Sequence, residues 1–403
     1  MCAATNRVFA RVCRKCRESQ LPFADGGERE CSVNIDKSQK QIDINRRFWF
    51  APVSYGGFLW CFSETGELFV VSPFDNQALP FSLLGEGFGR SAFTISAPEP
   101  GDYSDNLPPY LLAASPFSIK GVNLLDGKIK EFLQSAPDEL FISDFEDGYV
   151  GLESLERTIY FQKKRDGLSI LGSYNLLKNV AEDYHLPEKK VVGPLKIGQH
   201  IGVYSKDKLY LLKDGELKAQ LSFGSFQAWT SPAEFEKLQP RVGFMPYVVR
   251  GNSIYIPGIM GNDPGFLFVS FQGQTTNAAL NFIRFTEDAT YTEDVDSRLL
   301  VAKSGVIGYY DGTGFIPVRQ DPQLNAQIPP FSCQSLTVGF TRNASGVETL
   351  RFYSIDSLRD YSLAKFHGLI GIGFTSCAGT LTFSYLRERD NQEYLGLIIW
   401  DVQ

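Results

Sequence analysis

The sequence predicts an all-β fold, and three features indicate it. The chain of 403 residues is 13% aromatic, with 32 Phe and 18 Tyr, which favour the half-buried surface of a sheet. It also contains 37 Gly and 21 Pro, enough to separate many short strands by turns. From Arg46 onward, short apolar runs alternate with turn dipeptides, a pattern typical of strand, turn, strand. With 43% apolar and 21% charged residues, the chain is globular and long enough to bury a sizeable core.

Hairpins are predicted where a turn dipeptide separates two alternating apolar runs. Asp-Gly is the strongest signal, because a type I′ turn requires a positive φ at its central residues. The predicted turns are Thr65-Gly66, Asp126-Gly127, Asp166-Gly167, Asp214-Gly215 and Asp311-Gly312. A further apolar strand begins at Gly265, and the stretches TRNASGVETLRFYSI and TSCAGTLTFSYL have the same hairpin shape. Hairpin units therefore follow one another along most of the chain.

These units recur with a loose period of about 50 residues, which predicts a β-propeller of seven blades. One four-stranded sheet cannot bury both of its faces, whereas sheets packed around an axis bury both and leave only short edges. The intervals are irregular, so another all-β architecture such as a pair of β-sandwiches is the alternative. The predicted domains are a short Cys-rich N-terminal module at residues 1–45 and the propeller at residues 46–403.

The last residues, LGLIIWDVQ, place Trp400-Asp401 after an apolar strand. This resembles the WD dipeptide that closes a WD40 blade. The dipeptide occurs once, and no Gly-His pair or kelch double glycine accompanies it, so the resemblance is to β-propeller repeat proteins as a class. Two segments, residues 175–190 and 231–242, are predicted to interrupt the strands with a short helix before a proline.

The N-terminal stretch carries the strongest candidate metal site. Cys13 and Cys16 have the C-x2-C spacing with which two thiolates hold one tetrahedral metal, and Cys31 follows after fourteen residues. Cys2 is the best fourth ligand, so the predicted structural zinc site consists of Cys2, Cys13, Cys16 and Cys31. The stretch resembles the first half of a zinc ribbon or zinc knuckle only. Free cysteines in a flexible leader, or a redox-active pair, are the alternatives.

Charge and cysteine content limit the partners and the compartment. A net charge of -7 argues against general nucleic-acid binding. No window approaches 18 uncharged apolar residues and no secretory signal is recognised, which predicts a cytoplasmic protein without a membrane span. Seven cysteines, an odd number, argue against a disulfide framework. Three of them, Cys61, Cys333 and Cys377, are predicted to be buried small hydrophobes.

No catalytic or cofactor-binding residue is predicted. His185, His200 and His367 lie far apart, and neither H-E-x-x-H nor G-x-S-x-G occurs. The glycines of LLGEGFGRS lack the Lys-Ser/Thr pair of a P-loop.

The sequence therefore favours a non-enzymatic scaffold that presents the loop face of a propeller to a protein partner. The Cys-rich module would close the propeller or contact that partner. One alternative is a propeller enzyme of glycosidase or lactonase type, with acidic residues or a metal on the axis. Another is a carbohydrate- or surface-binding protein of viral or phage origin. The oligomeric state is left open.

Overall fold

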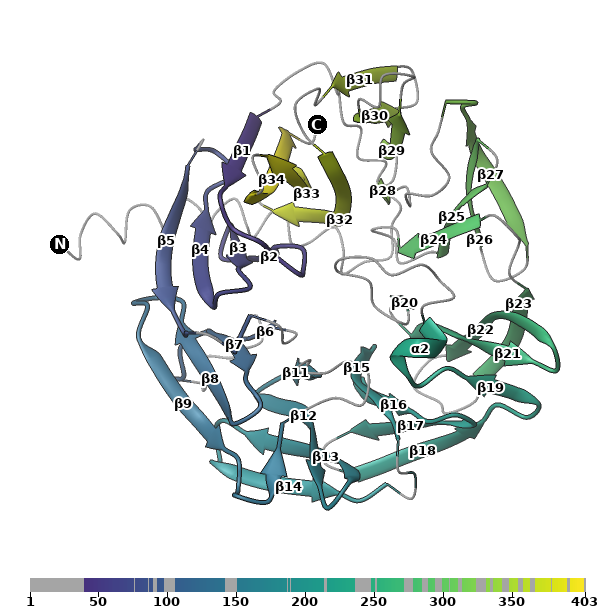
Figure 1. The fold of residues 1–403 in the computed structure, drawn as a ribbon. Coiled ribbons are helices and arrows are strands. Elements are labelled where there is room, and N and C mark those ends of the chain that lie inside the picture. Colours follow the sequence, from purple (N-terminus) through teal and green to yellow (C-terminus); the bar gives the residue numbers. More distant parts are fainter. Residues whose placement is uncertain are drawn as a thin grey trace.

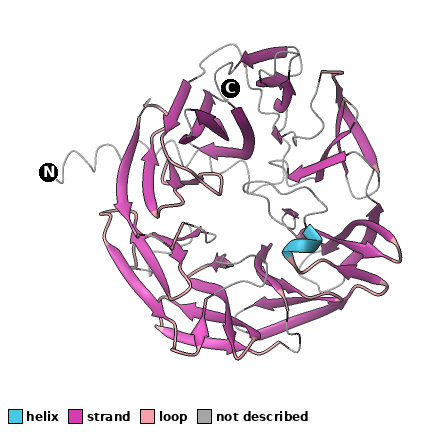
Figure 2. Cartoon of the chain, in the orientation of Figure 1, coloured by secondary structure: helices cyan, strands magenta, loops and turns pink. Residues whose placement is uncertain are grey.

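A computed structural model shows a ring of antiparallel sheets arranged around a central axis (Figure 1). The structure describes residues 40–401, with gaps at 76, 86, 90–92, 98–105, 142–150, 187, 189, 214–215, 236–247, 251, 272–277, 285–288, 294–298, 304, 311–313, 324–330, 334–335, 343–347, 354–357, 363–366, 378 and 390–391. Within these residues the secondary structure is strand, apart from the single turn of helix α2 (Pro232–Phe235) (Figure 2).

The described strands form eight sheets, which we number as blades in chain order. In each blade the strands follow one another from the centre of the ring to its circumference (Figure 1). Blades 1 to 4 comprise β2 (Val53–Tyr55), β3 (Phe58–Phe62), β4 (Glu67–Val71) and β5 (Ala78–Leu83); β6 (Phe93–Ser96), β7 (Tyr110–Ala114), β8 (Ser118–Asn123) and β9 (Ile129–Gln134); β10 (Glu139–Leu140), β11 (Leu152–Leu155), β12 (Thr158–Arg165), β13 (Leu168–Asn175) and β14 (Val180–Tyr184); and β15 (Val192–Ile197), β16 (His200–Tyr204), β17 (Lys208–Lys213) and β18 (Glu216–Ser222).

The second half of the ring repeats this plan. Blades 5 to 8 comprise β19 (Phe226–Ala228), β20 (Val248–Arg250), β21 (Ser253–Met260), β22 (Asp263–Phe271) and β23 (Ala278–Arg284); β24 (Ala289–Glu293), β25 (Leu299–Lys303), β26 (Val306–Tyr310) and β27 (Phe315–Gln320); β28 (Phe331–Cys333), β29 (Leu336–Arg342), β30 (Glu348–Tyr353) and β31 (Leu358–Ser362); and β32 (His367–Cys377), β33 (Thr380–Arg389) and β34 (Gln392–Asp401) with β1 (Lys40–Ile44).

The ring is closed by strands from opposite ends of the chain. β1 is the outermost strand of blade 8 and pairs with β34, with Lys40 opposite Ile399 and Ile44 opposite Leu395. Arg387 of β33 donates a hydrogen bond to the Asp43 carboxylate across this sheet. Because β1 belongs to the last blade, the propeller includes Lys40–Ile44 and does not start at Arg46, as the predicted domain boundary had it.

The core lies between the blades. At the closure, Ile44 of β1 and Leu397 of β34 pack with Leu59 of β3 in blade 1. Comparable buried clusters join blades 1 and 2, 2 and 3, 3 and 4, 4 and 5, and 5 and 6. Between blades 7 and 8 the Phe352 and Trp400 rings meet edge to face, with centroids 5.2 Å apart. The sheets of blades 1 to 5 and of blade 8 thus pack on a neighbour through both faces, as the propeller prediction requires.

The predicted β-propeller is confirmed, but the blade count differs from the predicted seven. The described residues form eight sheets, and each of the eight hairpin stretches in the sequence belongs to a different one. The count of seven was too low because a uniform period of about 50 residues was assumed, whereas the last hairpins are more closely spaced. The predicted helix at 175–190 is also wrong: this segment contains a turn and strand β14. At 231–242 a helix does begin, as α2, where Glu234 accepts hydrogen bonds from Ser231 as in a capping box.

The antiparallel order of the strands determines on which face of the ring each turn lies. In blades 3 and 5 two short strands, β10 with β11 and β19 with β20, pair with the same neighbour and together take the innermost position. With each such pair counted as one strand, first and third strands of a blade run in one direction, second and fourth strands in the other. Since a short link joins each outermost strand to the next innermost strand, every blade begins on the face where the previous one ended. The turns between third and fourth strands, which we call outer turns, therefore share one face. The turns between second and third strands, which we call middle turns, share the other.

Candidate functional site: an apolar collar on one face

Large apolar side chains are exposed at the outer turns of consecutive blades. Phe74, in the β4–β5 turn, is 42% exposed, and Leu125, in the β8–β9 turn, is 57% exposed. Leu177 takes the same place between β13 and β14, with 52% exposed. Further exposed apolar residues occupy the first three positions of the outermost strands. We call the whole set the apolar collar: Phe74, Leu79, Leu125, Ile129, Leu177, Val180, Leu217, Leu280, Phe315 and Ile316.

The same turn chemistry places three of these side chains. The Ser72 hydroxyl accepts a hydrogen bond from the backbone N–H of Phe74, at 3.3 Å. In the next two blades, Asn123 Oδ1 accepts from the N–H of Leu125 at 2.9 Å, and Asn175 Oδ1 from the N–H of Leu177 at 3.1 Å. A Ser or Asn side chain that bonds to the backbone two residues later fixes a tight turn. In all three blades the apolar residue at this position of the turn is exposed to solvent.

The repetition is what makes the collar a candidate site. Single exposed apolar residues are normal on a protein surface and need no explanation. Here they recur at the outer turns of blades 1 to 3 and within the first three residues of the outermost strands of blades 1 to 6. They also lie on or beside outermost strands, whose unpaired edges proteins usually protect with charge or distortion. An apolar series along such edges is suited to binding another polypeptide.

Charged groups stand among the collar residues. Asp75 follows Phe74 and is exposed, and Asp126 follows Leu125. A hydrogen bond from the Lys128 N–H, at 3.1 Å, holds the pKa of the Asp126 carboxyl below its usual range. Asp126 therefore stays ionised at neutral pH.

The first described residue of the chain lies at this collar. Lys40 Nζ donates a hydrogen bond to the Phe74 carbonyl at 2.9 Å and to the Pro73 carbonyl at 3.3 Å. This contact agrees with the topology, because the end of β34 and the start of β1 occupy the outer-turn position of blade 8. Lys40, the residue at which the described chain begins, thus lies beside Phe74.

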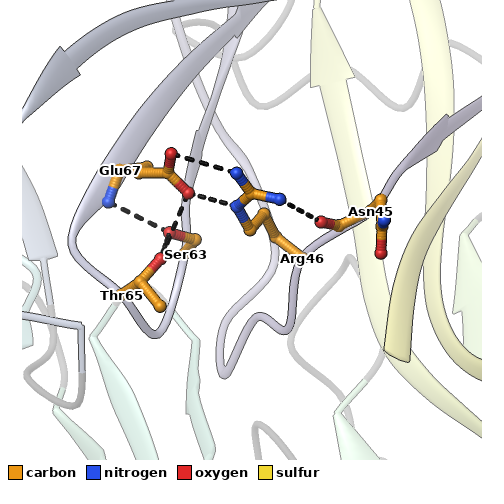
Figure 3. A network of polar contacts seen from close by, with 5 residues as sticks. All are labelled: Asn45, Arg46, Ser63, Thr65 and Glu67. Carbon is orange, nitrogen blue, oxygen red and sulfur yellow. Dashed lines mark hydrogen bonds and ion pairs between the residues drawn. The ribbon is translucent and has the colours of Figure 1, made fainter. Parts of the chain in front are cut away.

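The opposite face carries a polar network at the β3–β4 middle turn (Figure 3). The Arg46 guanidinium donates two hydrogen bonds to the Glu67 carboxylate, one of them at 3.2 Å to Oε1. The Ser63 hydroxyl accepts from the Glu67 N–H at 3.0 Å, and Thr65 donates to Glu67 at 3.2 Å. The hydrogen bond from Arg46 is the main reason why the pKa of Glu67 is lowered. The network fastens the β1–β2 connection to blade 1.

Two carboxylates belong to strands at the inner edge of blade 3. Glu153 of β11 accepts hydrogen bonds from Thr94 of β6, at 3.1 Å, and from the Ser154 N–H, at 2.9 Å. Burial raises the pKa of Glu153, although these hydrogen bonds and nearby Lys196 oppose the rise. Glu139 of β10 pairs with Lys163 at 3.1 Å. Both carboxylates are thus engaged in contacts between strands.

The predicted zinc ligands Cys2, Cys13, Cys16 and Cys31 lie outside the described residues, so the zinc site stays a prediction. Within the described part of the chain, no three His, Cys, Asp or Glu side chains form a group that could hold a metal ion. Nor does any helix of that part have the length and apolar character needed to span a membrane.

The predicted burial of two other cysteines is confirmed. Cys61 is 1% exposed and Cys377 is 2% exposed, and both belong to the apolar cluster between blades 8 and 1. Burial raises the pKa of the Cys61 thiol far above its usual value, so it stays protonated and unreactive. The Cys333 side chain is not among those described.

Comparisons with known proteins find no relative by sequence and list solved structures of low similarity. No family model matches the chain, and no curated protein matches its sequence. The N-terminal domain of Nup159 has a TM-score of 0.37 and 11% identity, covering 92% of this chain and 98% of that one. An oligogalacturonate lyase from Vibrio parahaemolyticus has a TM-score of 0.44 and 9% identity, covering 92% of this chain and 96% of the lyase. A chain from the structure of BBS1N in complex with ARL6DN has a TM-score of 0.41 and 13% identity, covering 93% of this chain and 97% of that one. Similarity at this level does not choose between their functions.

Proposed function

We propose that the protein is a cytoplasmic, non-enzymatic interaction module that binds a protein partner through the apolar collar. The proposal rests on one observation, the recurrence of exposed apolar side chains at the outer turns of blades 1 to 3 and near the start of the outermost strands of blades 1 to 6. A partner that covers several of them gains the favourable free energy of burying apolar surface, about 25 cal/mol per Å2 before the costs of association. The ring supplies the rigid support, since buried clusters join its blades.

The collar can be tested against a matched set of residues on the other face. Three exposed apolar residues, Leu83, Phe117 and Leu168, lie at the opposite ends of their strands or at middle turns, with 59%, 64% and 47% exposed. One triple variant changes the collar, Phe74→Ser with Leu125→Ser and Leu177→Ser. Its control changes the other face, Leu83→Ser with Phe117→Ser and Leu168→Ser. All six positions are exposed, so both variants are expected to fold, which thermal unfolding verifies.

The wild type and both variants would each serve as bait for affinity capture from the native source. A captured protein is then purified, and its affinity for each form is measured by calorimetry. We expect the control variant to bind like the wild type and the collar variant to bind about tenfold or more weakly, the effect typical of losing interface anchors. Equal affinity of all three forms for every captured protein would refute the collar as the binding face.

For residues outside the described structure we also propose a structural zinc ion held by Cys2, Cys13, Cys16 and Cys31. The C-x2-C pair supports it, and neighbouring Arg14, Lys15 and Arg17 would favour the thiolate forms. Metal content of the reduced, purified protein tests it, alongside a Cys13→Ser/Cys16→Ser variant. About one zinc per chain that the variant lacks would support the site. Protein without metal would exclude it.

A further inference from the structure

We propose that the apolar collar binds a segment of its own chain, the basic and apolar stretch within residues 1–39. The inference deepens the proposed function and rests on it, because a protein partner and this segment would use the same surface. Two independent features lead to it: the place where the segment joins the ring, and the match between its residue types and those of the collar.

The place of attachment follows from described contacts. The segment enters the ring at Lys40, whose ammonium group is hydrogen-bonded to the carbonyls of Pro73 and Phe74. Phe74 is itself a collar residue. With Cys2, Cys13, Cys16 and Cys31 on one zinc ion, the tether is the nine residues from Lys40 back to Cys31, which span at most about 30 Å at roughly 3.3 Å per residue. The outer turns of blades 1 and 2 are therefore within reach without any movement of the ring.

The residue types of the segment complement those of the collar. The stretch NRVFARVCRKCR contains the apolar residues Val8, Phe9 and Val12 among five basic ones, Arg7, Arg11, Arg14, Lys15 and Arg17. At the collar, exposed Phe74 is followed by Asp75, and exposed Leu125 by Asp126, whose carboxylate also pairs with Lys128 Nζ at 3.1 Å. Apolar side chains would cover apolar ones while opposite charges set the orientation.

Attachment makes a weak site sufficient. A tethered segment has an effective concentration on the order of 1 mM, so a site with a Kd of about 0.1 mM would be occupied about 90% of the time. A protein partner must then displace the segment, which lowers its apparent affinity by about tenfold. The segment would thus act as a built-in competitor that restricts access to the collar.

Limited proteolysis of the full chain tests the proposal. Trypsin cuts after the basic residues of the stretch, and mass spectrometry gives the cleavage rate under native conditions. The same two triple variants are compared with the wild type. If the collar substitutions weaken docking about tenfold, the undocked fraction rises from about one tenth to one half, so cleavage becomes about fivefold faster. The control variant on the opposite face should be cut at the wild-type rate.

A second measurement approaches the same contact from the other side. A triple variant of the full chain replaces the apolar residues of the segment: Val8→Ser, Phe9→Ser and Val12→Ser. Because its segment should no longer cover the collar, amide hydrogen exchange at residues 72–79 and 123–129 should become faster. Equal cleavage rates in wild type, collar variant and control, with unchanged exchange at the collar, would overturn the inference. That result leaves the proposed function intact if the collar variant still loses its partner. If cleavage accelerates but no partner depends on the collar, the docking stands and the proposed function fails.

Discussion

At the scale of single residues, glycines within strands allow aromatic rings to lie over the sheet. A Cβ added to Gly396 of β34 would come within 2.3 Å of the Tyr385 ring, and one added to Gly172 of β13 within 2.3 Å of the Phe161 ring. At Gly308 of β26 the obstacle is the Phe315 ring, at 2.4 Å. In each pair the ring comes from a neighbouring strand. Aromatic rings that cover strand glycines compensate for the missing side chain.

Replacing Gly396 with alanine should destabilise the protein. The methyl group would displace the Tyr385 ring, which is fully buried, and overpacking of this kind costs about 1 to 3 kcal/mol. Urea-induced unfolding measures the change. Gly314→Ala is the control: no atom lies within 4 Å of its added Cβ, so its free energy of unfolding should stay the same or rise slightly. Equal effects of both substitutions would contradict the ring-over-glycine arrangement.

The Arg46–Glu67 ion pair of Figure 3 should make the free energy of unfolding depend on pH in the acidic range. Because Arg46 lowers the pKa of Glu67 in the folded state, ionised Glu67 stabilises the fold above the unfolded pKa of about 4.3. The contribution is lost as the pH falls through the folded pKa. Both side chains are partly exposed, so Glu67→Gln should cost only about 0.2 to 1 kcal/mol at pH 7.

The difference in unfolding free energy between wild type and Glu67→Gln should therefore shrink towards zero in acid. Glu216→Gln is a suitable control, since its partner Lys218 lies on the same strand and the Glu216 side chain is 74% exposed. A gap that stays constant from pH 7 to acid would show that the Glu67 carboxylate is not stabilised by Arg46.

At the scale of elements, β1 differs from other outermost strands. Ile42 and Ile44 are 4% and 5% exposed and belong to the cluster between blades 8 and 1. Ile129, on the outermost strand β9, is 45% exposed and belongs to the collar. The closing strand is thus held by burial, whereas β9 offers its apolar side chains to solvent.

Truncation of an isoleucine on each strand should separate the two roles. Ile44→Ala removes buried contacts at the ring closure and should lower the free energy of unfolding by about 2 to 5 kcal/mol. Ile129→Ala should change it by no more than about 0.5 kcal/mol. Chemical unfolding of both variants measures this. A small effect at Ile44 would mean that β1 does not close the ring in solution.

At the scale of the whole molecule, the repeating hairpins made the propeller predictable. Turn dipeptides such as Asp126-Gly127 mark the hairpins directly, since their backbone requirement is local. Blade number was harder, because it depends on which hairpins share a sheet. The role of Lys40–Ile44 was missed for a similar reason: a short strand that pairs with the other end of the chain leaves no local signal.

The collar could not be recognised from periodicity, because exposure depends on which strand is outermost. Leu125 and Leu111 are both leucines of blade 2, yet Leu111 is fully buried. One local signal was available, the Ser or Asn two residues before Phe74, Leu125 and Leu177, which indicates a turn with an outward apolar residue. The zinc prediction concerns residues outside the described structure.

The central claim, that this face binds a partner, is tested most directly by footprinting a purified complex. Hydroxyl-radical oxidation, read by mass spectrometry, reports the solvent exposure of individual side chains in the free and bound chain. The chain carries Val8→Ser, Phe9→Ser and Val12→Ser, so that its own segment does not cover the collar before binding. We expect oxidation of Phe74, Leu125 and Leu177 to fall on binding, while Phe117 and Leu168 on the other face react as before. Protection of Phe117 and Leu168, with the collar still reactive, would contradict the account.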